Sequence, residues 1–304
     1  RTLMRLAVAA SPEVALPTLK ALAESSHDLI RVISQPDKPA GRGKVLTPTP
    51  VSTWAIENGV ELVRPSHSND LIPYLDDVDC VITIGYGVLL PEAILDIPRY
   101  GFLNLHFSLL PRWRGAAPVQ RAIEAGDSVT GVTVFKLDAG MDTGPIYTMH
   151  RFALDDDITS DELFVELGEL GVEAVMETLG KIEAGEKPKA QSNDGATRAM
   201  KLSREEARID WSETAKGISA KIRAFTSHPG AWTQFRSSPI KIAAPRISEI
   251  ALSPGEIAII DKKVLIGTAD KALEIGFITS AGKAQTPATA WANGARLMAG
   301  ERCE

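Results

Sequence analysis

Short apolar runs recur through the first hundred residues, and each is followed by turn residues or by a stretch with helical spacing. The runs cover residues 6–9, 29–34, 61–63, 80–84 and 102–106. Runs of this length are typical of strands, and strands that alternate with helices form a parallel sheet. The pattern predicts an α/β fold with a Rossmann-like, doubly wound domain, whose ligands bind beyond the C-terminal ends of the strands.

A long amphipathic pattern over 160–183 predicts the helix that closes this domain. Thr159 and Glu162 have the spacing of a capping box at its start. The next stretch, 185–203, is polar and lacks periodicity, which predicts a linker. We therefore expect one domain over 1–184 and another over 204–304, although a single large domain remains an alternative for 304 residues.

The C-terminal part has a different pattern. After a helix predicted at about 212–225, short apolar runs at 240–243, 255–260, 263–266 and 272–278 are divided by Gly, Pro, Asp and Ser. Several short strands with such turn signals predict a small β-barrel, which we expect to be OB-like.

Composition changes this picture little. Apolar residues make up 44 % and charged residues 24 % of the chain, as in water-soluble globular proteins. No apolar run approaches the roughly 20 residues that span a bilayer, and the first residues lack a signal-peptide core, so we expect a cytoplasmic protein without membrane contact. The two cysteines, Cys80 and Cys303, have neither the number nor the spacing of a disulfide framework or a metal site. We expect a buried thiol and a tail thiol.

Charge is distributed unevenly. Residues 204–304 contain 14 Lys and Arg against 11 Asp and Glu, which gives +3, whereas residues 1–203 have a net charge of −9. The overall charge of −6 argues against a general nucleic-acid binder. A small positive excess is usually a solvated surface, so it gains meaning only beside other evidence.

The candidate chemistry is concentrated in segment 104–118, which reads Asn-Leu-His-Phe-Ser-Leu-Leu-Pro-Arg-Trp-Arg-Gly-Ala-Ala-Pro. It resembles the signature of the folate-dependent formyltransferases, in which a strand carries an Asn and a His two residues apart and a Ser-Leu-Leu-Pro turn follows. Residues i and i+2 of a strand share a face, so Asn104 and His106 should point the same way. Segment 138–145 resembles the family loop with a catalytic aspartate, and Asp142 matches it. We interpret Asp138 as a turn former.

The resemblance implies transfer of a formyl group from 10-formyltetrahydrofolate to an amine. The site must then stabilise an oxyanion and move a proton from the amine to the leaving folate nitrogen. Asn104 can donate to the oxyanion, His106 can shuttle the proton, and Asp142 would orient His106 and raise its pKa, or fix a relay water. The scheme needs no metal, and the histidines lack the paired spacing of metal ligands.

The resemblance also places the folate against the Ser-Leu-Leu-Pro turn and against the loop at 85–91. The expected folate contacts are Ser108, Leu109, Leu110, Pro111, Tyr86, Gly87 and Leu89. Neither 85–91 nor the first strand's turn contains GxGxxG, which argues against a dinucleotide enzyme. The first turn has Ala9-Ala10-Ser11-Pro12 where the family commonly has Gly-Thr-Pro, and Phe107 replaces a frequent Gly. We expect Ala10 to need a negative φ and Phe107 to narrow the space beside His106.

Two further segments resemble the family members that act on tRNA. Segment 35–44 is similar to a loop that they use against the acceptor stem, and there Lys38, Arg42 and Lys44 can bind phosphates or base edges. Segment 201–211 is similar to their junction with the C-terminal domain, which adds Lys201 and Arg204 as tRNA contacts. The resemblance implies methionyl initiator tRNA as the amine substrate. We expect the protein to be a monomer.

Two alternatives remain open. An amino-sugar nucleotide formyltransferase shares the Asn, His and Asp set and can also carry a second C-terminal domain, and the loop with Arg42 discriminates against it. A non-catalytic RNA-binding protein with this fold would not need Asn104, His106 and Asp142 together.

Overall fold

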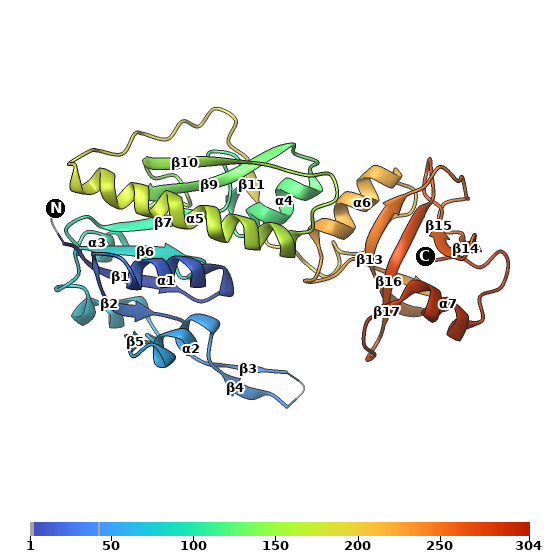
Figure 1. The fold of residues 1–304 in the computed structure, drawn as a ribbon, viewed down its shortest axis with the longest axis horizontal. Helices are drawn as coiled ribbons and strands as arrows, with labels where there is room; N and C mark the ends of the chain where they lie inside the picture. Colours follow the sequence, from blue (N-terminus) through green and yellow to red (C-terminus); the bar gives the residue numbers. More distant parts are fainter. Residues whose placement is uncertain (1–2, 42) are drawn as a thin grey trace. The chain divides into compact units, whose positions relative to one another are not determined.

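The computed structural model describes residues 3–41 and 43–304, which form two compact units (Figure 1). The units alternate along the chain. The first contains the chain up to 115 together with 129–153 and 164–198, and the second contains 116–128, 154–163 and 199–304. Arg42 lies outside the described residues.

The first unit is built on a seven-stranded sheet with the order β10-β9-β7-β6-β1-β2-β5. Its strands are β1 (Arg5–Ala10), β2 (Asp28–Ile33), β5 (Glu61–Val63), β6 (Cys80–Ile84), β7 (Phe102–His106), β9 (Val129–Lys136) and β10 (Ile146–Ala153). The five strands that the apolar runs predict are parallel to one another. Strands β9 and β10 add to β7 in antiparallel pairing, so the sheet is mixed rather than wholly parallel.

Helices flank this sheet. They are α1 (Leu16–Ala23), α2 (Pro50–Glu57), α3 (Glu92–Leu95) and α5 (Ser160–Glu183), with short 3-10 turns at Glu13–Ala15 and Ser68–Tyr74. Helix α5 has the predicted bounds, and its capping box is formed, because the Thr159 amide donates to Glu162 at 2.9 Å and the Glu162 amide donates to the Thr159 hydroxyl at 3.3 Å. A small hairpin of β3 (Lys38–Ala40) and β4 (Val45–Thr47) projects after β2.

The strand order reverses direction between β1 and β6, and this is where doubly wound sheets bind ligands. The turns after the two strands pack closely. A Cβ on Gly85, which has a φ of 56°, would lie 2.6 Å from Pro12. Ala10 lies within β1 and is not among the described residues with positive φ, so the substituted first turn needs no strained backbone there.

Close packing of α5 on β7 decides which way the β7 side chains point. A Cβ on Gly171 of α5 would lie 2.6 Å from Leu105, so Leu105 faces the helix. The Phe107 ring packs edge-on against Phe164 of α5, with 6.3 Å between ring centres. The expectation that Phe107 narrows the space beside His106 is therefore not supported, and the alternating residues Asn104 and His106 take the opposite face of the strand.

The second unit combines helices with an antiparallel sheet. Its helices are α4 (Pro118–Glu124), α6 (Ala215–Ala224) and α7 (Ala288–Ala295), and its strands are β12 (Trp232–Phe235), β13 (Ser238–Ile247), β14 (Ile257–Ile260), β15 (Lys263–Ile266), β16 (Leu273–Ser280) and β17 (Thr286–Pro287). The order is β12-β13-β16-β15-β14, with β17 on β16. The C-terminal residues 301–304 contact both edge strands of this sheet. Gln234 of β12 and Glu304 exchange backbone hydrogen bonds, and the amide of Ile257 of β14 donates to the carbonyl of Glu301. An OB-like topology stays a prediction.

The stretch predicted as a linker is ordered along much of its length. Lys189 exchanges backbone hydrogen bonds of 2.7 and 2.8 Å with Ile146 of β10, and Thr197 accepts from the Arg114 amide at 2.9 Å. Two-residue strands occur at β8 (Arg114–Gly115) and β11 (Arg198–Ala199). Residues 185–198 of this stretch therefore belong to the first unit, while the domain boundaries at 184 and 204 stay predictions.

Both cysteines are free and buried, which agrees with the expectation for Cys80 but corrects the view of Cys303 as a tail thiol. Among residues 3–41 and 43–304, no helix has both the length and the apolar character that crossing a membrane requires.

Candidate active site

Asn104 lies on β7 opposite Thr83 of β6, and the two side chains are hydrogen-bonded. The Thr83 hydroxyl donates to the carbonyl of Leu103 at 2.9 Å. Because this bond uses the only hydroxyl proton, Thr83 can only accept from Asn104, whose Nδ2 lies 2.8 Å away. The orientation of the Asn104 amide is thereby fixed, and one N–H of Nδ2 remains to donate elsewhere.

The tautomer of His106 follows from its partner. Nε2 lies 2.9 Å from the carbonyl oxygen of Trp113, which can only accept, so Nε2 carries the proton and Nδ1 carries the lone pair. Nδ1 lies 3.9 Å from Oδ2 of Asp142. This separation is longer than a hydrogen bond, as expected for two acceptors that face each other.

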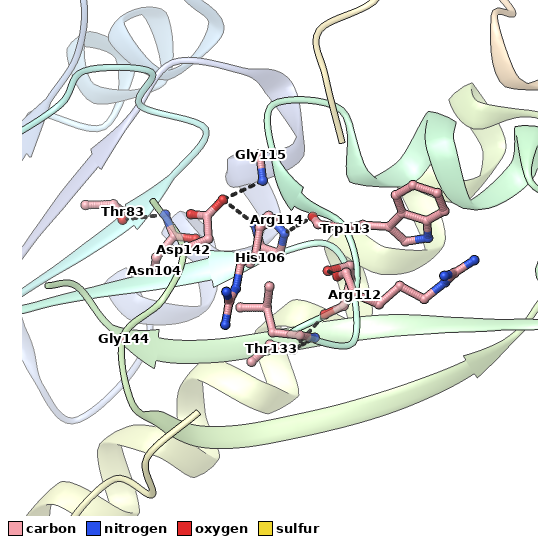
Figure 2. Close-up of polar contacts among 12 residues, drawn as sticks. Thr83, Asn104, His106, Arg112, Trp113, Arg114, Gly115, Thr133, Asp142 and Gly144 are labelled. Carbon is pink, nitrogen blue, oxygen red and sulfur yellow. Dashed lines mark hydrogen bonds and ion pairs between the residues drawn. The ribbon is translucent and has the colours of Figure 1, made fainter. Parts of the chain in front are cut away.

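Asp142 comes from the loop between β9 and β10. Its φ of 55° lies in the left-handed region, which is uncommon for residues other than glycine. The carboxylate accepts a hydrogen bond of 2.7 Å from the amide of Gly115, and Figure 2 traces the contacts from Gly115 through Asp142 to His106 and Trp113. Asp138 accepts from Gly140 and Thr143 within the same loop, as its predicted role as a turn former requires.

The pKa of His106 lies below its ordinary value of 6.5. Burial is the main cause, because it disfavours the charged imidazolium, while the charge of Asp142 and the bond to Trp113 act in the opposite direction. The expectation that Asp142 raises this pKa is correct for its own contribution, but burial outweighs it. His106 is therefore neutral near pH 7 and can accept a proton at Nδ1.

The Ser-Leu-Leu-Pro turn follows directly on β7 and is held by its own hydrogen bonds. The Ser108 hydroxyl is buried and donates to the Arg112 carbonyl at 2.6 Å, while Thr133 donates to the Ser108 carbonyl at 2.6 Å and accepts from the Leu110 amide at 3.2 Å. The side chain of Ser108 is therefore occupied in shaping the turn. Leu110 and Pro111 line a cavity of about 550 Å³ bounded by β10 and residues 186–192.

The loop after β6 is held by Gln35, which follows β2 in the chain. Gln35 donates to the carbonyl of Tyr86 at 2.7 Å, and Tyr86 itself is buried. Gly87 has a φ of 72°, and a Cβ there would lie 3.1 Å from the Gln35 amide. Leu89 is 79 % exposed, which is unusual for a leucine and leaves an apolar surface beside this loop.

The expected tRNA contacts occupy two places. Lys38 and Lys44 are exposed on the β3–β4 hairpin of the first unit, where the Lys38 ammonium donates to Gln35 at 2.6 Å. Lys201 and Arg204 are exposed in the second unit, and the Arg204 guanidinium lies over the Trp232 ring at 5.8 Å. Within the described residues of the first unit, no hydrogen bond or ion pair joins Lys38 or Lys44 to Asn104, His106 or Asp142.

The sequence analysis did not identify three residues that contact the site. Thr83 is the one polar residue in the otherwise apolar strand β6, and this position is the signal by which the sequence could have indicated it. Gly115 acts through its backbone amide, which no side-chain pattern reveals. Gln191 lies in the polar stretch after α5, and its amide donates to the carbonyls of Asp142 and Gly144, both at 3.0 Å.

Among the residues that the structure describes, no group of three or more His, Cys, Asp and Glu side chains is arranged to hold a metal ion. The candidate site consists of a fixed amide donor, a neutral imidazole and a carboxylate. Such a set can stabilise an oxyanion and transfer a proton.

Comparison with known proteins agrees with this chemistry. Residues 4–179 match the model of the formyl transferase family, and residues 201–296 match that of the formyl transferase C-terminal domain. A methionyl-tRNA formyltransferase of Salinispora tropica is 42 % identical, over 98 % of this chain and 99 % of that protein.

Solved structures are similar in fold. HypX from Aquifex aeolicus in complex with tetrahydrofolic acid has a TM-score of 0.67 and 21 % identity, covering 96 % of this chain and 47 % of HypX. WlaRD, a sugar 3N-formyl transferase, has a TM-score of 0.67 and 19 % identity, covering 93 % and 100 % of the two chains. On the extent of the matched families and the full-length relative, this chain belongs to the formyl transferase family.

Proposed function

We propose that this protein transfers the formyl group of 10-formyltetrahydrofolate to the amino group of methionyl initiator tRNA. The observation that carries the chemistry is a neutral His106 whose Nδ1 faces the carboxylate of Asp142 at 3.9 Å. The tRNA assignment is supported by the relative of Salinispora tropica, which is matched over 99 % of its length.

In the proposed reaction the amine nitrogen attacks the formyl carbon, and the carbonyl electron pair moves onto oxygen. The free N–H of Asn104 donates to this oxyanion, while Thr83 holds the amide in place. A preorganised donor stabilises the charged intermediate more than the planar formyl group, which is what accelerates the step.

The attacking amine must then lose a proton. His106 accepts it at Nδ1, directly or through one water, and the imidazolium so formed lies beside the negative Asp142. When the tetrahedral intermediate collapses, the same proton passes to the leaving folate nitrogen as its bond to the formyl carbon breaks. The scheme gives no step to a metal ion.

Two loops at the C-terminal ends of β6 and β7 are the proposed folate site. Their residues are Tyr86, Gly87, Leu89, Ser108, Leu109, Leu110 and Pro111. The exposed Leu89 offers apolar surface to a flat ring, and the tightly bonded Ser108 turn keeps backbone groups in fixed positions.

The acceptor tRNA is proposed to contact Lys38, Arg42 and Lys44 in the segment after β2, together with Lys201 and Arg204. The domains that we propose are a catalytic domain over 1–184, a connection over 185–203 and a C-terminal domain over 204–304 that adds further tRNA contact. A monomer in the cytoplasm is the form in which we expect the enzyme to act.

An amino-sugar nucleotide is the second candidate acceptor, since a sugar formyl transferase shares the fold. Incubation with labelled 10-formyltetrahydrofolate and either methionyl initiator tRNA or a dTDP-amino sugar separates the two. We expect labelled formylmethionyl-tRNA and no labelled sugar. Transfer to the sugar alone would refute the tRNA assignment.

A further inference from the structure

Gln191 holds the loop that carries Asp142, although it lies far along the chain. Its Nε2 donates to the carbonyl oxygens of Asp142 and Gly144, each at 3.0 Å. Both protons of the amide nitrogen are thereby used, one on each of two residues of the same short loop. The loop backbone is fixed at two points by one side chain.

Arg114 fixes the orientation of that side chain. Its Nε and Nη2 donate to the Gln191 Oε1 at 2.9 and 2.7 Å. A guanidinium can only donate, so the oxygen of Gln191 must face Arg114 and the nitrogen must face the loop. The next residue, Gly115, donates its amide to the Asp142 carboxylate at 2.7 Å. Residues 114 and 115 thus fix both the main chain and the side chain of Asp142.

The conformation of the loop explains why it needs external support. The left-handed φ of Asp142 costs energy for a residue with a side chain. At the other end of the loop Asp138 makes local bonds to Gly140 and Thr143, but the carbonyls at 142 and 144 have Gln191 as their partner.

We propose that Gln191 is a positioning residue for formyl transfer, which keeps the Asp142 carboxylate beside His106 through the loop backbone. The inference rests on the proposed function, because it concerns the same catalytic side chains. It also gives the segment after α5 a role in the active site beyond connecting two domains.

The test is Gln191→Met, which keeps the side chain's length and neutrality but removes its donors and acceptor. We expect kcat to fall on the order of 10- to 100-fold while KM for folate and for tRNA changes little, since displacement of a catalytic group by about 1 Å has such an effect. The titration midpoint of His106, followed by NMR of its imidazole nitrogens, should also fall. Asp142 is the charge that raises this pKa, so its displacement lowers the midpoint.

Asn193→Ala is the matched control. Asn193 accepts from Nη1 of the same Arg114 at 3.1 Å, and no hydrogen bond of its side chain to the loop is described. It should keep the wild-type kcat and midpoint. If Gln191→Met fails to fold, Arg114→Lys is the second variant, because it keeps the positive charge but loses the two-point contact with Gln191. It should lower kcat and the His106 midpoint, each by less than we expect for Gln191→Met.

An unchanged kcat in Gln191→Met, or a reduced kcat with an unchanged His106 midpoint, overturns the inference. A residue that only supports folding would lower the melting temperature without moving the midpoint. If wild-type protein does not formylate methionyl initiator tRNA, the proposed function fails, while the NMR titration still decides whether Gln191 positions Asp142.

Discussion

His106 and Asp142 face each other at 3.9 Å, with the unprotonated Nδ1 directed at Oδ2. The Trp113 carbonyl sets this arrangement by holding the proton on Nε2. Because burial keeps the imidazole neutral, the carboxylate exerts its main effect only after His106 has accepted a proton. The pair is therefore suited to stabilise a charge that exists during the reaction.

Removal of the imidazole should affect turnover far more than binding. His106→Ala is expected to lower kcat by about 10²-fold or more, since positioned acid–base groups contribute that much. Equilibrium binding of charged tRNA should stay near wild type because His106 is buried. Unchanged single-turnover rates would refute its role in proton transfer.

Neutralising the carboxylate tests the stabilisation of the imidazolium. Asp142→Asn can still accept from the Gly115 amide, so we expect the loop to keep its conformation. The loss of negative charge should lower kcat and lower the pKa of His106 further. Rapid-quench measurements of formyl transfer under single-turnover conditions give the rate, and wild-type rates would contradict the assignment.

Thr83 is expected to matter through Asn104. Thr83→Val keeps the shape but removes the hydroxyl that orients the amide, so kcat should fall on the order of 10-fold, less than the roughly 10²–10³-fold loss of a whole oxyanion donor in Asn104→Ala. Thr83→Ser keeps a hydroxyl and serves as the control. The prediction fails if the valine and serine variants turn over equally fast.

Arg42 distinguishes tRNA recognition from a general transferase. Arg42→Ala should reduce kcat/KM for charged initiator tRNA and leave folate binding and melting temperature nearly unchanged. Arg42→Lys should recover only part of the loss if a planar two-point contact matters, and nearly all of it if only charge matters. Loss of one phosphate contact should flatten the slope of log K against log salt by about one unit. Wild-type kinetics with tRNA in Arg42→Ala would exclude the contact.

The sequence predicts the parts of the fold where one local signal dominates. Helix α5 has its predicted bounds because the Thr159–Glu162 capping box coincides with the start of the apolar period. The five parallel strands are visible in the sequence as short apolar runs, although only Val63 of β5 is buried. Strand β10 is harder to recognise, because at the sheet edge it mixes buried Thr148 with exposed Met149 and Arg151.

The site is predictable where side chains do the chemistry and hidden where backbone groups do. Segments 104–118 and 138–145 resemble family motifs, and they contain Asn104, His106 and Asp142. The Trp113 carbonyl and the Gly115 amide have no side-chain signature. Gln191 makes its contacts only because residues 189–198 run along the first unit, and their polar composition resembles a linker. The low pKa of His106 also depends on burial that a sequence does not reveal.

NMR titration of His106 in the free protein, assigned with His106→Ala, tests the central claim most directly. The account predicts a neutral tautomer with the proton on Nε2 and a midpoint below 6.5. In Asp142→Asn the midpoint should lie lower still, because the carboxylate raises the pKa. A midpoint at or above 6.5, a proton on Nδ1 in the neutral form, or an Asp142→Asn midpoint equal to wild type would contradict the account.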